Sequence, residues 1–232
     1  MIDSRDYLRD KLHRDGYCVI ENIAREQQLE EAIPTDLSWH LSYYPSEDNN
    51  EAGSFLADDT VSYRNKIKYT QERSRELGKD LIMSFAFLRN INDEDALLRD
   101  LLAKRFEDIS YITGYDITGY SSTFLSKYEQ GCYLATHNDE FEPPAPRFAF
   151  VLGLTKGWCS HWGGLTIIEG KDPLAATAIT PAYNALMIFK VPVWHMVSEV
   201  NNCAAHSRLA FSGWFKPSKV LSHSSSSFWN TP

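Results

Sequence analysis

Hydrophobic and polar positions follow two different periods along this chain, and the period changes near residue 121. In the first half, apolar side chains recur at helical spacing, which predicts helices over residues 4–14, 26–32, 93–109 and, interrupted by Gly78, 71–81. The segment YCVIENI at residues 17–23 is rich in strand-forming residues and is predicted to be a strand. The first half is therefore expected to be mainly helical.

From Ser121 onward, short runs of strand-forming residues follow one another, separated by Gly, Pro and Asn. These runs are SSTFLSKY, CYLATHND, RFAFVLGL, GLTIIEG, NALMIFK, HMVSEV and SRLAFSGWF. Several strands at this spacing are typical of a β-sandwich or a jelly-roll barrel. We therefore expect an α+β fold in which N-terminal helices buttress a C-terminal β-core.

The same pattern predicts one domain in three parts: a support region at 1–120, a β-core at 121–217 and a flexible Ser-rich tail at 218–232. The acidic, polar segment 44–59 is expected to be a long surface loop. Within the predicted helix 93–109, an apolar stripe is expected to pack into the core, formed by Leu97, Leu98, Leu101, Leu102 and Phe106.

Composition excludes several classes of protein. Hydrophobic residues make up 43% of the 232-residue chain and the formal net charge is -8, so a globular fold is expected and a protein built to bind nucleic acid or anionic membrane is not. No apolar run approaches the ~20 residues that a membrane-spanning helix needs, and the charged N-terminus does not resemble a secretory signal. The four dispersed cysteines form no CxxC pair, which favours reduced thiols in a cytoplasmic protein.

The chain contains the triplet His-x-Asp twice. His13-Arg14-Asp15 falls where the first helix is expected to end, so its charges are interpreted as a helix C-terminus and a turn. His137-Asn138-Asp139 instead closes the predicted strand CYLATH, where alternate residues share one face. His137 and Asp139 can therefore point the same way and chelate one metal ion, although a polar strand end at the surface would give the same triplet.

Two further residues extend this pattern. His195 begins HMVSEV directly after an apolar strand, where its imidazole can face a barrel interior. In SRLAFSGWF, strand alternation places Arg208, Ala210, Ser212 and Trp214 on one face. A buried guanidinium needs an anionic partner, and its planar fork suits a carboxylate. That partner could be a ligand, or an Asp or Glu of the protein in a structural ion pair.

In order and spacing, His137, Asp139, His195 and Arg208 resemble the motif of the iron(II)/2-oxoglutarate-dependent oxygenases, in particular the prolyl-hydroxylase type. Further segments carry the resemblance: YEQG at 128–131, LTKGW at 154–158, the GGL turn at 163–165 and RLAFSGWF at 208–215. The resemblance extends over residues 84–216 and, with fewer matching features, over 1–25.

The resemblance implies a double-stranded β-helix, a cupin-like jelly roll with helices packed on one side. It implies that His137, Asp139 and His195 ligate iron(II), that Arg208 pairs with the distal carboxylate of 2-oxoglutarate, and that Tyr128 lines the co-substrate pocket. Some prolyl hydroxylases carry a second pocket tyrosine where this chain has Gly153. Either Ser212 or Tyr128 supplies that hydroxyl here, or the pocket differs.

The implied reaction is hydroxylation of an unactivated C–H bond, with O2 as oxidant and 2-oxoglutarate converted to succinate and carbon dioxide; ascorbate is a further candidate reductant. Related halogenases replace the carboxylate ligand by a small residue, so Asp139 favours hydroxylation. A peptidyl proline is one expected substrate, and a free amino acid or small natural product is the alternative. Glu140 and Glu142 could favour a cationic substrate, or could form a merely solvated acidic surface.

A third alternative is not an enzyme: a cupin-like barrel that binds a metal or a sugar. Arg208 argues against it, because a simple metal-binding barrel needs no arginine facing inward near the metal. The oligomeric state stays open at this point.

Overall fold

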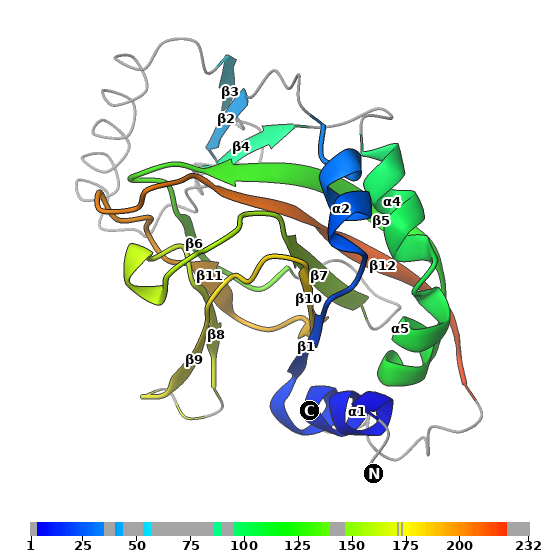
Figure 1. The fold of residues 1–232 in the computed structure, drawn as a ribbon. Coiled ribbons are helices and arrows are strands. Elements are labelled where there is room, and N and C mark those ends of the chain that lie inside the picture. Colours follow the sequence, from blue (N-terminus) through cyan, green and yellow to red (C-terminus); the bar gives the residue numbers. More distant parts are fainter. Residues whose placement is uncertain are drawn as a thin grey trace.

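Two antiparallel sheets pack face to face, and helices cover the outer face of the larger sheet (Figure 1). The structure is a computed structural model, and it describes residues 4–34, 40–43, 53–56, 86–89, 95–139, 147–170, 172 and 174–221. This two-layer arrangement confirms the predicted α+β fold with a jelly-roll core.

The larger sheet has eight strands in the described part of the chain. In spatial order they are β1 (Tyr17–Glu21), β10 (Ala185–Val191), β7 (Arg147–Gly153), β12 (Arg208–Val220), β5 (Tyr115–Tyr128), β4 (Ala86–Arg89), β2 (His40–Tyr43) and β3 (Gly53–Leu56). The smaller sheet has the order β6 (Leu134–His137), β11 (His195–Val197), β8 (Thr166–Glu169) and β9 (Ala176–Ile179). The larger sheet thus combines strands from both halves of the sequence, and the predicted boundary at residue 121 falls within β5.

Helix α1 (Ser4–Asp15) and helix α2 (Glu26–Ala32) lie where the sequence predicts them, as does strand β1 between them. The single helix predicted over 93–109 is instead two helices, α4 (Ala96–Ala103) and α5 (Phe106–Thr113). The chain breaks at Arg105, whose guanidinium donates to the carbonyl of Ile23 at 2.8 Å. This turn lets α5 run along β5 with its own apolar face inward.

The predicted apolar stripe of that segment is correct except at one position. Leu98, Leu101 and Leu102 are buried, whereas the side chain of Leu97 is 60% exposed. Residues three or four apart share a helix face, and Leu97 lies about 100° around the helix from Leu98. Because both residues are leucines, hydropathy alone does not distinguish the exposed Leu97 from the buried Leu98.

Part of the predicted loop 44–59 is also wrong, because residues 53–56 form strand β3 against β2. Strand β9 was not predicted; its four residues, ATAI, are mostly exposed and include only one large apolar side chain. The remainder of the 44–59 segment, the predicted helix 71–81 and residues 222–232 of the tail lie outside the described residues.

The two faces of the larger sheet bury two different clusters. Phe150, Phe211 and Phe215 pack on the helical side, and the rings of Phe150 and Phe215 stack with centroids 4.6 Å apart. Ala149, Met187 and Phe189 face the smaller sheet and form the interior of the barrel. Each fully buried apolar side chain stabilises the fold by about 1.5–3 kcal/mol. The alternation predicted for β12 is therefore confirmed, because Phe211 and Phe215 face the helices and Trp214 faces the barrel.

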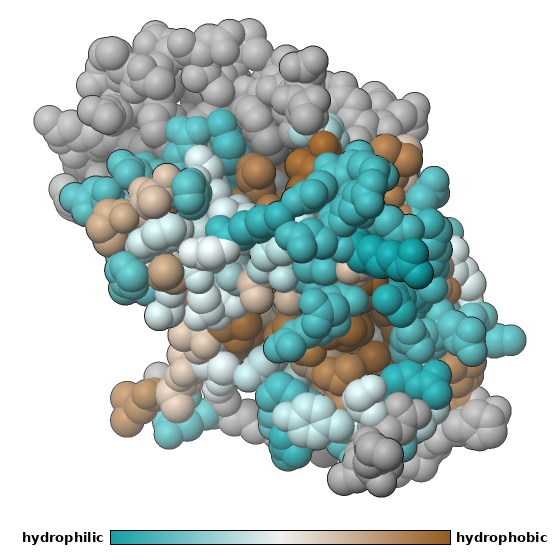
Figure 2. Space-filling view, in the orientation of Figure 1, coloured by the Kyte–Doolittle hydropathy of each residue, from teal (hydrophilic) through white to brown (hydrophobic). Residues whose placement is uncertain are grey.

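The surface side chains of the helices are mostly polar, whereas their inner sides are apolar. Figure 2 shows hydrophilic side chains over α2, whose exposed positions are mostly charged, while Leu29 and Ala32 on its inner side are buried. Figure 2 shows an apolar tip near the end of the β8–β9 hairpin. In the segment that joins these two strands, the side chain of Leu174 is 94% exposed. No helix in the described part of the chain is long and apolar enough to cross a membrane.

Candidate metal centre and co-substrate pocket

His137 and His195 meet across the smaller sheet. His137 ends β6, His195 begins β11, and the two residues are direct antiparallel partners. In each ring the Nδ1 atom lies 2.8 Å from a backbone carbonyl oxygen two residues earlier in the chain, that of Ala135 or Val193. If Nδ1 carries the proton and donates to that carbonyl, Nε2 is left as a lone-pair donor facing the barrel interior.

Asp139 completes the group from just beyond the end of β6. Its backbone φ of 53° is in the left-handed region, which Asp adopts more readily than most residues. This conformation turns the carboxylate back toward the imidazoles: Oδ1 lies 3.4 Å from Nε2 of His137, and Oδ2 lies 3.6 Å from Nε2 of His195. The indole N–H of Trp214 donates to Oδ2 at 3.1 Å.

The donor set fits a ferrous ion. One ligand atom from each of His137, Asp139 and His195 can be chosen so that all lie within 4.8 Å of one another. Two imidazoles and one carboxylate on one face of a metal are the set used by non-haem iron(II) oxygenases, and they leave other coordination positions open. Burial, and then the neighbouring His137, lower the pKa of His195, which favours the neutral imidazole that metal binding requires.

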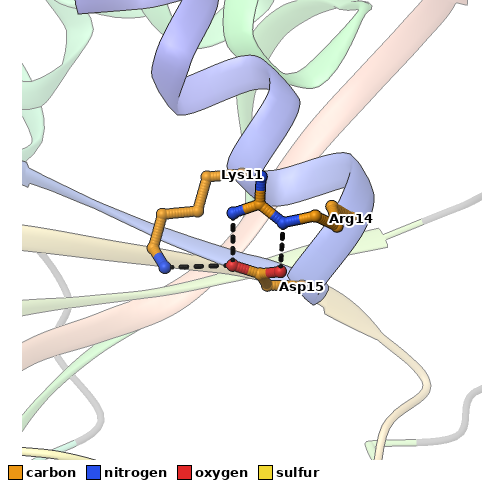
Figure 3. A network of polar contacts seen from close by, with 3 residues as sticks. All are labelled: Lys11, Arg14 and Asp15. Carbon is orange, nitrogen blue, oxygen red and sulfur yellow. Dashed lines mark hydrogen bonds and ion pairs between the residues drawn. The ribbon is translucent and has the colours of Figure 1, made fainter.

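The other His-x-Asp triplet is held in a different way (Figure 3). Asp15 ends α1, and its carboxylate accepts hydrogen bonds from Lys11 at 3.1 Å and from Arg14 at 2.7 Å and 3.0 Å. These two cations, Arg14 first, lower the pKa of Asp15 to about 2. As predicted, the charges of this triplet belong to a helix terminus, and in the described part of the chain no metal-binding group includes them.

Arg208 lies at the start of β12 and is 2% exposed. Its terminal nitrogen donates to the hydroxyl of Thr166 at 3.4 Å, and its guanidinium carbon lies 5.0 Å from the ring centre of Tyr128, its partner on β5. Within the part of the chain that the structure describes, Arg208 has no ion pair with an Asp or Glu, and its buried Nε has no hydrogen-bond partner. A buried cation without an anion fits a site for a ligand carboxylate.

Burial also fixes the charge states in this pocket. It raises the pKa of Tyr128 to about 12, although Arg208 opposes the shift, so the phenol is neutral and can donate a hydrogen bond. Burial lowers the pKa of Arg208, but a guanidinium remains charged at neutral pH. The pocket therefore presents one positive charge and the hydroxyls of Tyr128 and Thr166.

The two other positions singled out in the sequence have different surroundings. Gly153 on β7 has no room for any side chain, because a Cβ atom there would lie 2.0 Å from the carbonyl oxygen of Ala182. Ser212 is buried on the same face as Arg208, but four residues and thus about 13 Å farther along β12. Thr166 is the hydroxyl residue that the structure brings to Arg208.

Strand β8 connects the two halves of the site. Ile168 on β8 is the partner of His195, and Thr166 lies two residues away on the same inward face, about 7 Å along the strand. Thr166, which accepts from the guanidinium of Arg208, therefore lies on the strand that also pairs with His195.

Sequence reasoning missed three contributors. Thr166 sits in GLTIIEG, where its inward position follows from alternation with Ile168, but nothing marked it as the partner of Arg208. Strand alternation predicted that Trp214 faces inward, but nothing in the sequence indicated its hydrogen bond to Asp139. Gly164, at φ 61°, lies so close to Arg208 that a Cβ atom would be 3.1 Å from the arginine Cδ. Glu140 and Glu142, considered for the substrate mouth, lie outside the described residues.

Comparison with known proteins gives a fold for the chain and a family match for part of it. Residues 123–216 match the family model of the 2OG-Fe(II) oxygenase superfamily. No curated protein matches the chain. Similar solved structures include an oxidoreductase of the 2OG-Fe(II) oxygenase family from Burkholderia pseudomallei, at 11% identity and a TM-score of 0.63, covering 95% of this chain and 94% of that one.

Two further similar structures are prolyl hydroxylases. The prolyl-4-hydroxylase of Pseudomonas putida is 15% identical, with a TM-score of 0.57 and coverage of 91% of this chain and 98% of that one. A prolyl hydroxylase from Trichoplax adhaerens, in complex with a peptide fragment of the oxygen degradation domain of hypoxia inducible factor, is 13% identical with a TM-score of 0.59, covering 91% and 88%. At these identities the likeness establishes the double-stranded β-helix fold.

The matched segment contains all four residues of the sequence motif, from His137 to Arg208. The resemblance seen in the sequence is thus confirmed over residues 123–216, the segment that matches the 2OG-Fe(II) oxygenase superfamily model.

Proposed function

We propose that this protein is an iron(II)- and 2-oxoglutarate-dependent dioxygenase that hydroxylates an unactivated C–H bond of a prolyl residue in a peptide or protein. The observation that carries the proposal is the pairing of two features in one barrel interior. His137, Asp139 and His195 converge at one place. Arg208, buried without an ion pair in the described part of the chain, bonds to Thr166 on β8, the strand that pairs with the strand of His195.

Each protein group has a positioning role in this proposal. His137, Asp139 and His195 hold the iron, which supplies the oxygen-activating chemistry when it is bound. The guanidinium of Arg208 and the hydroxyl of Thr166 bind the distal carboxylate of 2-oxoglutarate, so that its 2-oxo acid end is directed to the metal. The neutral phenol of Tyr128 closes the pocket beside the guanidinium and excludes water from it.

The barrel interior next to the metal is apolar, which supports a reaction in which water is excluded from the oxidising centre. Phe189 packs edge-on against His195 with centroids 4.8 Å apart, and Met187 and Val191 lie in the same cluster. Asp139 supplies a carboxylate where a halogenase would need an open position, and this supports hydroxylation as the outcome.

The choice of a prolyl substrate is supported by the fold shared with two prolyl hydroxylases, one of which is held in complex with a peptide. The same iron and co-substrate site would also serve a free amino acid or a small natural product. Those substrates differ only in what occupies the open side of the metal, so the substrate test must compare them directly.

The first test is an anaerobic titration of the metal-free protein with iron(II) and 2-oxoglutarate, followed by visible absorption. A charge-transfer band that requires both components, and that weakens in Asp139→Ala and in Arg208→Ala, is the expected result. Iron binding without any band on adding 2-oxoglutarate would contradict the proposal and would favour a barrel that only binds metal.

The second test measures succinate formation with proline-containing peptides, free proline and other free amino acids. Stimulation by peptides, with a mass increase of one oxygen atom on proline, is expected. If only a free amino acid stimulates succinate formation, the proposed reaction stands but its substrate is a free amino acid instead of a prolyl residue.

A further inference from the structure

We propose that Trp214 is a positioning residue of the metal centre: its indole N–H fixes the carboxylate of Asp139 so that one oxygen, Oδ1, is presented to the metal. This inference rests on the proposed function. Its basis is the hydrogen bond from Nε1 of Trp214 to Oδ2 of Asp139, at 3.1 Å.

The contact joins two residues that are far apart in the chain and differ in their backbone setting, one within the larger sheet and one beyond a strand end. Trp214 is in the middle of the larger sheet, paired with Ser122 on β5 and with Ala149 on β7. Its ring also packs against Phe124, with centroids 5.8 Å apart. Asp139 lies beyond the end of the short strand β6, in a left-handed backbone conformation. The central sheet therefore supplies a fixed donor to a ligand that its own strand does not hold.

The bond also distinguishes the two carboxylate oxygens. Oδ2 accepts the hydrogen bond from the indole N–H and lies 3.6 Å from Nε2 of His195, whereas Oδ1 lies 3.4 Å from Nε2 of His137. A carboxylate without this bond could bind a metal through both oxygens and occupy one more coordination position. The proposed reaction needs the remaining positions for 2-oxoglutarate and O2. Holding Oδ2 with an indole keeps Asp139 to one oxygen.

Packing alone does not account for this arrangement. The indole N–H is directed at a metal-ligand carboxylate within ordinary hydrogen-bond distance. Partners that orient metal ligands change metal affinity by about 10- to 100-fold when removed. Trp214→Phe removes the donor and retains an aromatic ring against Phe124.

The experiment measures Co(II) binding to the metal-free protein by visible absorption, without 2-oxoglutarate or substrate. The matched control is Trp158→Phe, which also removes an indole hydrogen bond, in this case the 2.9 Å bond to the carbonyl of Gly163. We expect Trp214→Phe to weaken Co(II) binding roughly 10- to 100-fold and to change the intensity of the d–d bands, which depends on coordination number. Trp158→Phe should do neither.

A second arm repeats Trp214→Phe in an Asp139→Ala background, where no further loss of Co(II) affinity is expected because the carboxylate is gone. An equal loss of Co(II) affinity in both backgrounds would overturn the positioning role, and so would an unchanged affinity and spectrum in Trp214→Phe. In either case, Co(II) binding by the wild type would still support the proposed metal centre. Failure of the wild type to bind Co(II) would overturn the metal centre itself, and this inference with it.

Discussion

His137 and His195 lie opposite each other on adjacent strands, with ring centroids 4.1 Å apart and an interplanar angle of 49°. Both Nδ1 atoms lie within hydrogen-bond distance of backbone carbonyls, so both Nε2 atoms face the carboxylate of Asp139. The two imidazoles are thus oriented by the strands themselves before any ion binds. Preorganisation of this kind means that a divalent ion should bind the folded chain and not the unfolded one.

Metal binding should therefore raise the thermal stability of the protein. At an ion concentration of 100 times Kd the gain in unfolding free energy is about 2.7 kcal/mol, which corresponds to an increase in Tm of about 5–10 °C for a chain of this size. Thermal unfolding with and without Mn(II) measures this. His195→Ala should abolish the increase, and His13→Ala, in the other His-x-Asp triplet, should retain it. An equal increase in both variants would place the ion elsewhere.

Replacing Arg208 should separate co-substrate binding from stability. Arg208→Met removes a buried charge that has no ion pair in the described part of the chain, and replacing buried charges by apolar residues is often neutral or stabilising by about 1–4 kcal/mol. We expect an unchanged or higher Tm for the metal-free protein. Binding of 2-oxoglutarate should weaken by about 30-fold or more, because losing one partner of a buried charge pair costs about 2 kcal/mol or more.

Calorimetric titration and thermal unfolding of the same Arg208→Met preparation check both outcomes. A large fall in Tm together with intact 2-oxoglutarate binding would show that the guanidinium serves the fold instead of the ligand.

Gly164→Ala should impair co-substrate binding through a single methyl group. The new Cβ would lie 3.1 Å from the Cδ of Arg208 and 3.1 Å from a ring carbon of Trp158, so Arg208 must shift. Gly157 is a matched control, because its φ of 66° is close to the 61° of Gly164 and a Cβ there meets nothing within 4 Å. Both variants should lose about 1–2 kcal/mol of unfolding free energy to left-handed backbone strain.

Only Gly164→Ala should also raise the KM for 2-oxoglutarate, as measured from succinate formation. If Gly157→Ala raises it equally, the effect comes from the backbone and not from displacement of Arg208.

His13 should make the stability of the protein depend on pH. Burial, and then the charges of Arg9 and Lys190, lower its pKa below the ordinary 6.5. The unfolded chain therefore binds a proton at His13 near pH 6.5 that the folded chain takes up only at lower pH, so the unfolding free energy falls as pH drops through this window. This contribution of His13 to the unfolding free energy is fully retained above the pKa that His13 has in the unfolded chain.

Urea unfolding of wild type and of His13→Gln, from about pH 5 to about pH 8, tests this prediction. The variant should lose less stability on acidification than the wild type does. Parallel pH profiles would show that His13 is protonated equally in both states.

The direction of side chains on the strands of the site could be predicted from the sequence. Strand alternation is a covalent property of the extended backbone, so the inward direction of Arg208 and Trp214 follows from the spacing of the apolar positions between them. The same reasoning separated His137 from His13, since one follows a strand and the other ends a helix. Helix break points are less predictable: the turn at Arg105 depends on a carbonyl of Ile23 that no local pattern reveals.

By itself, the sequence determined the fold class, the order of the metal and arginine motifs and the inward face of β12, because these depend on local periodicity and on the chemistry of each side chain. Only the tertiary structure decided which side chains meet across strands: Thr166 with Arg208, Trp214 with Asp139, and Gly164 against the arginine stem. Those contacts depend on register between strands that are distant in sequence. Register is fixed by the packing of the whole barrel and not by any single segment.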